Sequence, residues 1–308
     1  MQILVTGGTG QIGSRLVPAL LKKGHVPVIL TRREAAARKM FGEGCKVVEG
    51  NPARPGDWQK AAADCDAIVN LAGENLFNHR WNDKFKAMMT ESRIQATRNV
   101  VAAVSSKPRR ADGEPKTLVN GSAIAYYGAT ADEELTEESP PASDFLARLC
   151  QDWETEARKA EPSGVRLAMI RIGIVLDKKA GALPNLLTPF RLGIGGPVAG
   201  GKQWMSWIHH EDMTGLLSMA LENAAAVGPI NGTAPHPVTN RDFGKALGKA
   251  LHRPSFMPTP RLMLRAMLGE VADVVATGQR VLPKRALALG YSFKYPQIDA
   301  ALAEIVAS

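Results

Sequence analysis

The sequence predicts an α/β fold with a doubly wound parallel sheet, followed by a smaller C-terminal lobe. An apolar strand pattern at residues 2–5 runs into a glycine-rich turn, and a helical pattern follows from residue 11. Strand and helix patterns then alternate as far as residue 176, which is typical of parallel strands joined by right-handed crossover helices. Beyond residue 177, glycines interrupt the alternation, so we expect a separate lobe there.

The remaining elements follow from hydrophobic periodicity and from the glycine and proline positions. In the first part we expect further strands at residues 25–30, 46–49, 66–71, 117–123 and 167–176, and helices at 11–24, 34–41, 84–104 and 142–159. In the second part we expect helices at residues 212–226, 240–252 and 260–276, and a short strand at 228–231. We therefore expect one domain over residues 1–176, its sheet completed by the strand at 228–231, and a lobe over residues 177–308.

The overall composition suits a globular protein with an anionic ligand. The chain has 308 residues, 45% of them hydrophobic, and 38 Lys and Arg against 30 Asp and Glu. The positive charge is not gathered into a basic run, so we expect no nucleic-acid partner. The three cysteines lie far apart, which indicates neither a metal site nor a disulfide framework and fits a reducing cytoplasm. We expect no signal peptide and no membrane span.

The turn that follows the first strand is the clearest candidate for a binding site. A strand that enters a helix through a glycine-rich turn presents free backbone amides and a helix N-terminus to an anion such as a dinucleotide pyrophosphate. The glycines are spaced G-x-x-G-x-x-G, and an ordinary tight turn is the alternative interpretation. The residues that we assign to this site are Gly7, Thr9, Gly10, Gln11, Ile12 and Gly13.

The end of the second strand indicates which dinucleotide binds. An acidic side chain there binds the ribose hydroxyl of NAD, whereas arginine accommodates the 2′-phosphate of NADP. This chain has Thr31 and Arg32 at that position, and Glu34 lies two residues further on. Arginine forms paired, charge-assisted bonds to phosphate. We therefore expect NADP(H) as the cofactor, with a solvated arginine as the alternative.

These segments resemble a known family. Thr6 to Gly13 is similar to the fingerprint of the extended short-chain dehydrogenase/reductases, a Rossmann-type group that includes nucleotide-sugar epimerases. The fourth strand ends in Asn70-Leu-Ala-Gly73, which resembles the N-x-A-G segment of this family. The resemblance implies cofactor contacts by Leu71, Ala72, Gly73 and Glu74.

The fifth strand ends in Gly121-Ser122-Ala-Ile-Ala-Tyr126-Tyr127-Gly128. In the family this strand carries the catalytic serine, with Tyr-Gly four residues later. The resemblance implies catalytic roles for Ser122 and for Tyr126 or Tyr127, although the spacing here is five residues. The alternative for Ser122 is a hydroxyl that satisfies a backbone group at the strand end.

The proton-transfer pair of the family, Tyr-x-x-x-Lys, is absent. We expect its two positions at Phe145 and Leu149, neither of which can carry a proton. The same departure is found in an atypical branch, the YfcH-like "epimerase family protein" group with a C-terminal domain of unknown function. Segments that resemble this branch run through the whole chain, among them Glu91-Ser-Arg93, Asp152-Trp-Glu154, Trp204-Met-Ser-Trp-Ile-His209 and Leu282-Pro-Lys-Arg285.

Four further residues are candidates for contact with a small-molecule substrate, namely Arg80, Arg171, Trp207 and His209. Three of them have a structural alternative: a helix cap for His209, core packing for Trp207 and a buried ion pair for Arg171. The favoured function is an NADP(H)-dependent oxidoreductase or epimerase acting on a small polar substrate of the nucleotide-sugar kind. The alternative is an NADP(H)-binding sensor or scaffold that has lost catalysis.

Overall fold

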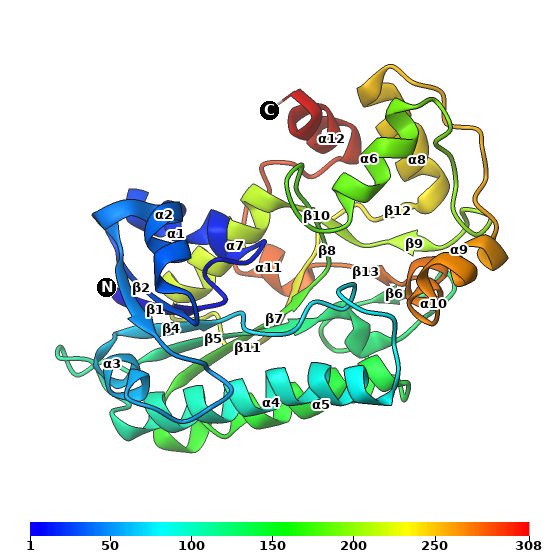
Figure 1. Cartoon of the computed structure of the whole chain (residues 1–308). Helices are drawn as coiled ribbons and strands as arrows, with labels where there is room; N and C mark the ends of the chain where they lie inside the picture. Colours follow the sequence, from blue (N-terminus) through cyan, green and yellow to red (C-terminus); the bar gives the residue numbers. More distant parts are fainter. Residues whose placement is uncertain (308) are drawn as a thin grey trace.

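The computed structural model describes residues 1–307 and confirms the predicted doubly wound parallel sheet (Figure 1). Seven strands pair in the order β11-β7-β5-β4-β1-β2-β3, all of them parallel. Their bounds are β1 Gln2–Thr6, β2 Val26–Thr31, β3 Lys46–Glu49, β4 Ala67–Asn70, β5 Thr117–Ala123, β7 Arg166–Ile172 and β11 Gly228–Gly232. All their carboxyl ends therefore meet at one edge, where ligands bind in open α/β sheets.

Helices cover both faces of the sheet (Figure 1). One face packs against α1 and α7, with α2 and α11 beside them; the other packs against α3, α4 and α5. The bounds are α1 Gly13–Lys22, α2 Glu34–Phe41, α3 Trp58–Asp64, α4 Asp83–Ser106, α5 Phe145–Arg158, α7 His210–Glu222 and α11 Lys284–Ala288. The sequence did not predict α3. Its Trp58 and Ala62 are buried against strands of the sheet, which are contacts that local periodicity does not report.

The C-terminal lobe has a hydrophobic core of its own, formed by α6, α8, α12 and short strands. Its elements are α6 Leu183–Arg191, β9 Trp204–Met205, β12 Val238–Thr239, α8 Asn240–Leu251, α9 Arg261–Leu268, α10 Val271–Ala276 and α12 Ile298–Ala307. The helix predicted at 260–276 is two helices, because Gly269 adopts φ +69° between them. Three-residue or four-residue 3₁₀ turns lie at Gly42–Gly44, Ile124–Tyr127 and Glu161–Ser163.

The lobe and the sheet domain are interleaved along the chain. The predicted strand at 167–176 divides at Gly173, after which β8 Ile174–Leu176 leaves the sheet and pairs with β10 Trp207–His209. The chain returns through α7 and β11. Later β13 Arg280–Val281 pairs with β6 Glu134–Leu135, which follows β5. Residues near 280 therefore lie beside the ends of β5 and β7, far from them in sequence. Within the described residues, no helix is both long and apolar enough to cross a membrane.

Candidate cofactor and active site

The glycine-rich turn has the geometry that a phosphate requires. Gly7 adopts φ +66°, and a Cβ there would lie 2.8 Å from the carbonyl oxygen of Leu71. A Cβ on Gly13 would lie 2.7 Å from the carbonyl oxygen of Gly8, whereas one on Gly10 would meet only Gly7 at 3.1 Å. The first turn of α1 contains no acidic residue, and Ile12 has no polar side chain to cap it. The amides of Ser14 and Arg15 already donate to the carbonyl oxygens of Gly10 and Ile12. Among the described residues, the amides of Gln11, Ile12 and Gly13 are therefore the ones left for an anion.

The side chain of Gln11 points away from this anion site. It donates to the carbonyl oxygens of Val175 at 3.1 Å and Ala180 at 3.4 Å, and one turn later Arg15 pairs with Asp177 at 2.7 Å. These contacts bind the turn to the segment that follows β8. Only the backbone of Gln11 remains available to a phosphate. Thr9 is partly exposed within the same turn.

The end of β2 presents an unpaired positive charge. Arg32 is exposed and forms no ion pair or side-chain hydrogen bond within residues 1–307. Glu34 pairs with Arg38 at 2.6 Å, so its carboxylate is held by the next turn of α2. The hydroxyl of Thr31 accepts the amide of Arg33 at 3.1 Å and shapes the strand end. The guanidinium of Arg32 is therefore free for a phosphate.

The loop after β4 is held beside the glycine-rich turn. The hydroxyl of Thr6 donates to Asn70 at 2.7 Å and accepts the amides of Leu71 and Ala72, each at 3.1 Å. The amide of Glu74 donates to the hydroxyl of Ser92, and its carboxylate accepts from Asn78. The four residues predicted to contact the cofactor, Leu71 to Glu74, thus flank the turn at the same sheet edge.

A buried polar network lies at the ends of β5 and β7. Arg171 forms a two-point ion pair with Glu154 of α5, with N–O distances of 2.8 and 2.9 Å. Ser122 donates to the same carboxylate at 2.7 Å. A third nitrogen of Arg171 donates to the hydroxyl of Tyr127, which in turn donates to Asn231 at 2.7 Å. The exposure of these residues ranges from 0 to 4%, so all five are shielded from solvent.

The three residues predicted to be catalytic differ in whether their hydroxyls take part in this network. The hydroxyls of Ser122 and Tyr127 are both used inside the protein, and burial raises the pKa of Tyr127 to about 12. Tyr126 differs: its ring lies over Arg171, with the guanidinium carbon 3.5 Å from the ring centroid. Its hydroxyl has no hydrogen-bond partner among the described residues and is not enclosed. Of the three, Tyr126 alone offers a hydroxyl to a ligand.

Helix α5 presents a different face to the site from the one expected. Leu149 packs with Phe85 and Met89 of α4, and Phe145 packs on the same cluster. The side chain that meets the backbone of Ala123 at the end of β5 is Cys150, and burial raises its pKa to about 12. At the end of β5, α5 thus presents Cys150, which is one residue and about 100° of helix rotation away from Leu149. No lysine occupies either register.

Comparison with known proteins identifies the family. The model of the NAD dependent epimerase/dehydratase family matches residues 3–231, and that of a domain of unknown function, DUF1731, matches residues 259–305. The chain belongs to the NAD dependent epimerase/dehydratase family. The resemblance to the extended short-chain dehydrogenase/reductases is thereby confirmed. The family match includes the glycine-rich turn and the ends of β4, β5 and β7.

Relatives match this epimerase-family chain from end to end. Human epimerase family protein SDR39U1 is 38% identical, and the match covers all of both chains. YfhF of Bacillus subtilis is 37% identical over all of this chain and 98% of its own. The chloroplastic SDR39U1 homolog of Arabidopsis thaliana is 41% identical over 99% of this chain and 87% of its own.

Solved structures agree with the fold. A crystal structure of human SDR39U1 with NADPH has a TM-score of 0.88 at 37% identity and covers all of both chains. UDP-glucose 4-epimerase of Thermus thermophilus, solved with NAD, has a TM-score of 0.80 at 18% identity, with 100% of this chain and 98% of that chain covered. The second likeness shows the fold alone.

The residues predicted to contact a substrate all make contacts within this epimerase-family chain. Trp207 is fully buried in the core of the lobe, and its indole donates to the carbonyl oxygen of His236 at 3.1 Å. Arg80 donates to two carbonyl oxygens at the end of α9 and so links the loop after β4 to the lobe. Arg171 is in the buried ion pair described above. For Trp207 and Arg171 the structural alternatives fit the observed contacts.

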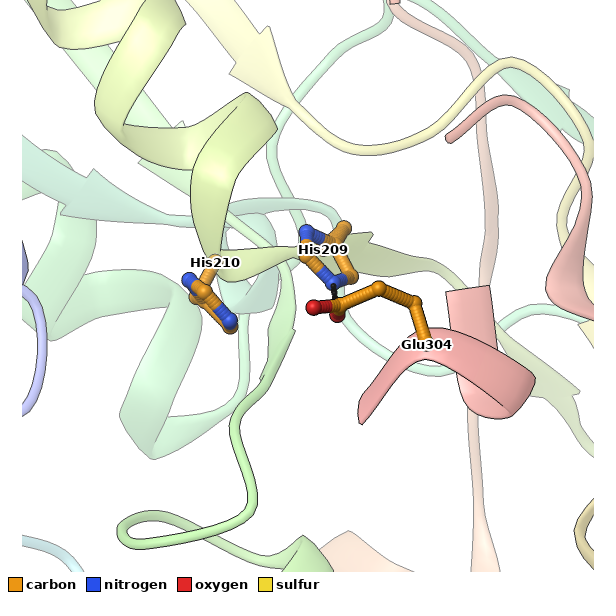
Figure 2. Close-up of side chains that lie close together, drawn as sticks. All are labelled: His209, His210 and Glu304. Atoms are coloured by element: carbon orange, nitrogen blue, oxygen red, sulfur yellow. Dashed lines mark hydrogen bonds and ion pairs between the residues drawn. The ribbon is translucent and has the colours of Figure 1, made fainter. Parts of the chain in front are cut away.

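His209 is a helix cap and also the centre of a small cluster (Figure 2). Its Nδ1 accepts the amide of Glu211 at the start of α7, and its Nε2 lies 2.8 Å from a carboxylate oxygen of Glu304 on α12. His210 lies alongside, so three potential metal ligands are within 4.8 Å of one another. The cap requires the proton on Nε2, where a metal ion would need a lone pair. The arrangement therefore fits a tether between α7 and α12 better than a metal site.

Two residues that the sequence did not single out as site residues belong to this edge of the sheet, namely Glu154 and Asn231. Glu154 and Asn231 carry the buried network, and Arg93 lies below Gly73. Arg93 and Glu154 fall within segments that resemble the family branch, which was the available signal. The partners of Glu154 and Asn231 lie 17 to 104 residues away in sequence, so no local spacing predicts these contacts.

Proposed function

We propose that this chain binds NADP(H) across the carboxyl ends of the sheet. The observation that carries the proposal is the unpaired Arg32 at the end of β2, with Glu34 held away by Arg38. The unbonded amides of Gln11, Ile12 and Gly13, at the start of α1, would supply a pyrophosphate site next to it. The human relative that was crystallised with NADPH supports the same cofactor. The dinucleotide would extend from Arg32 past β1 towards the ends of β4 and β5.

We further propose an oxidoreductase that works in the reducing direction on a small polar carbonyl compound, nucleotide sugars included. When bound, NADPH supplies a hydride. Tyr126 would donate its hydroxyl proton to the substrate oxygen as negative charge develops there, and solvent would reprotonate the phenol. In the family a lysine assists proton abstraction by the phenol, and α5 carries no lysine. Abstraction of a substrate proton, which epimerisation through oxidation requires, is thus less well supported than reduction.

The second candidate function is an NADP(H)-binding sensor or scaffold. The observation that favours it is the absence of a lysine from α5 in either register, together with the engagement of Ser122 and Tyr127 in the buried network. In this case the edge of the sheet would bind the cofactor and signal its presence without turnover.

The test is turnover of NADPH with a broad set of carbonyl compounds and nucleotide sugars. Tyr126→Phe should lower kcat by about 10²- to 10⁴-fold, the usual contribution of a positioned acid, while NADPH affinity stays nearly unchanged. Tyr127→Phe is the matched control, and its main effect should be on stability. If no compound in the set oxidises bound NADPH, the sensor or scaffold function replaces the proposed reductase function.

A further inference from the structure

Arg93 is a cation held inside the protein without a counter-ion. It lies on α4, and its guanidinium donates to the carbonyl oxygens of Met89 at 3.1 Å and Glu74 at 3.0 Å. It also lies 5.3 Å from the ring centroid of Trp153. Among the described residues it forms no ion pair with a carboxylate. Both partners are neutral carbonyls, so its full charge is unbalanced locally.

This arrangement is costly in the free protein. Burial lowers the pKa of Arg93, and only the more distant Glu74 and Cys150 oppose that effect. An arginine nevertheless keeps its proton at any physiological pH. The other partly buried arginines at this edge are paired, Arg171 with Glu154 and Arg15 with Asp177. An unpaired cation at a ligand-binding edge suggests a role towards the ligand.

Arg93 lies near the part of the sheet edge where one half of the proposed cofactor would bind. A Cβ on Gly73 would lie 3.1 Å from its guanidinium carbon, so Arg93 lies directly against the loop after β4. It also interacts electrostatically with Cys150, the α5 residue that meets the end of β5. Arg32 marks the opposite, adenine side of the sheet edge, at β2. The sheet order places β4 and β5 beyond β1, where the nicotinamide half would lie.

We propose that Arg93 supplies, from α4, the positive charge of the nicotinamide end of this site, in place of the lysine that α5 lacks. This proposal rests on the proposed binding of NADP(H). The charge would favour the reduced, neutral nicotinamide over the oxidised, cationic ring. It would also stabilise negative charge that develops on a substrate oxygen nearby. Both effects match a site that reduces its substrate.

The ratio of two dissociation constants tests this proposal without any substrate. The ratio is Kd for NADP⁺ divided by Kd for NADPH, measured by calorimetry or by fluorescence. Arg93→Gln removes the repulsion of the cationic ring and should lower the ratio by about 4- to 30-fold, for charges ~8–10 Å apart at an intermediate dielectric constant. Arg93→Lys keeps the charge and should leave the ratio within about threefold of the original value. Arg98→Gln, on the exposed side of the same helix, is the matched control.

Gly73→Ala provides a second variant in case Arg93→Gln does not fold. Its methyl group would displace the guanidinium that lies 3.1 Å away, so the ratio should fall in the same direction by a smaller factor. An unchanged ratio in the folded variants, or an equal loss of affinity for both dinucleotides, would overturn the role of Arg93. Failure of the unsubstituted protein to bind either dinucleotide would instead overturn the proposed function on which this inference rests.

Discussion

The two ends of the ligand-binding edge use their polar groups in opposite ways. At β1 and β2 several polar groups are free: the amides of Gln11 to Gly13 have no hydrogen-bond partner, and Arg32 has no ion-pair partner in residues 1–307. At β5 and β7 they satisfy one another, as in the buried pair of Arg171 with Glu154. The first end is prepared to bind an anion. The second end is a rigid support that leaves Tyr126 and Arg93 available for a ligand.

This difference predicts which substitutions affect ligand binding and which affect folding. A residue at the free end should change affinity with little change in stability. A residue in the buried network should change stability with little change in affinity, because it touches the protein and not the ligand. Substitutions at either end test this difference between effects on affinity and effects on stability.

The largest effect is expected at the glycine-rich turn. Gly10→Val should abolish binding of both NADP and NAD while the fold persists, because a side chain there meets little protein but would occupy the phosphate site. Gly13→Val should lose binding and also stability, because its Cβ would collide with the backbone of Gly8. Thermal melts with and without NADPH measure both effects. Stabilisation by NADPH that survives Gly10→Val would place the phosphates elsewhere.

The next effect concerns the buried network. Glu154→Gln leaves Arg171 buried without a counter-ion and should lower the free energy of unfolding by about 3–5 kcal/mol. NADPH affinity of the folded variant should change little. Glu161→Gln is the control, since its pair with Arg158 is exposed and such pairs contribute about 0–1 kcal/mol. Urea unfolding measures both variants, and equal losses would mean that the network does not support this end.

The smallest effect is expected at the end of β2. Arg32→Ala removes charge-assisted bonds worth about 1.5–3 kcal/mol, so NADP affinity should fall by about 10- to 150-fold. NAD affinity and the melting temperature should hardly change, because Arg32 forms no ion pair and no side-chain hydrogen bond among the described residues. Calorimetry with both dinucleotides is the measurement. An equal loss for NADP and NAD would show that Arg32 does not read the 2′-phosphate.

Much of this protein can be predicted from its sequence because the relevant interactions are local. The parallel sheet follows from alternating strand and helix patterns. The anion site depends on glycines within seven residues of one another, Gly7 to Gly13, and the choice of dinucleotide depends on Arg32 at a strand end. Each feature involves backbone geometry or a single side chain near a recognisable element. The residues that form it are close in sequence and therefore also close in the structure.

The end of the candidate site at β5 and β7 depends on contacts that no local pattern contains. Ser122 at a strand end has the same spacing whether it meets a ligand or Glu154, and a one-residue shift on α5 exchanges Leu149 for Cys150. Because each residue turns the helix by about 100°, such a shift changes the direction of the side chain greatly, and the amino-acid pattern does not reveal it. The packing of α4 and α5 against the sheet sets which side chains face β5. The tertiary fold brings a carboxylate to Arg171 and none to Arg93. Whether a buried charge is costly depends on such neighbours, which only folding brings together.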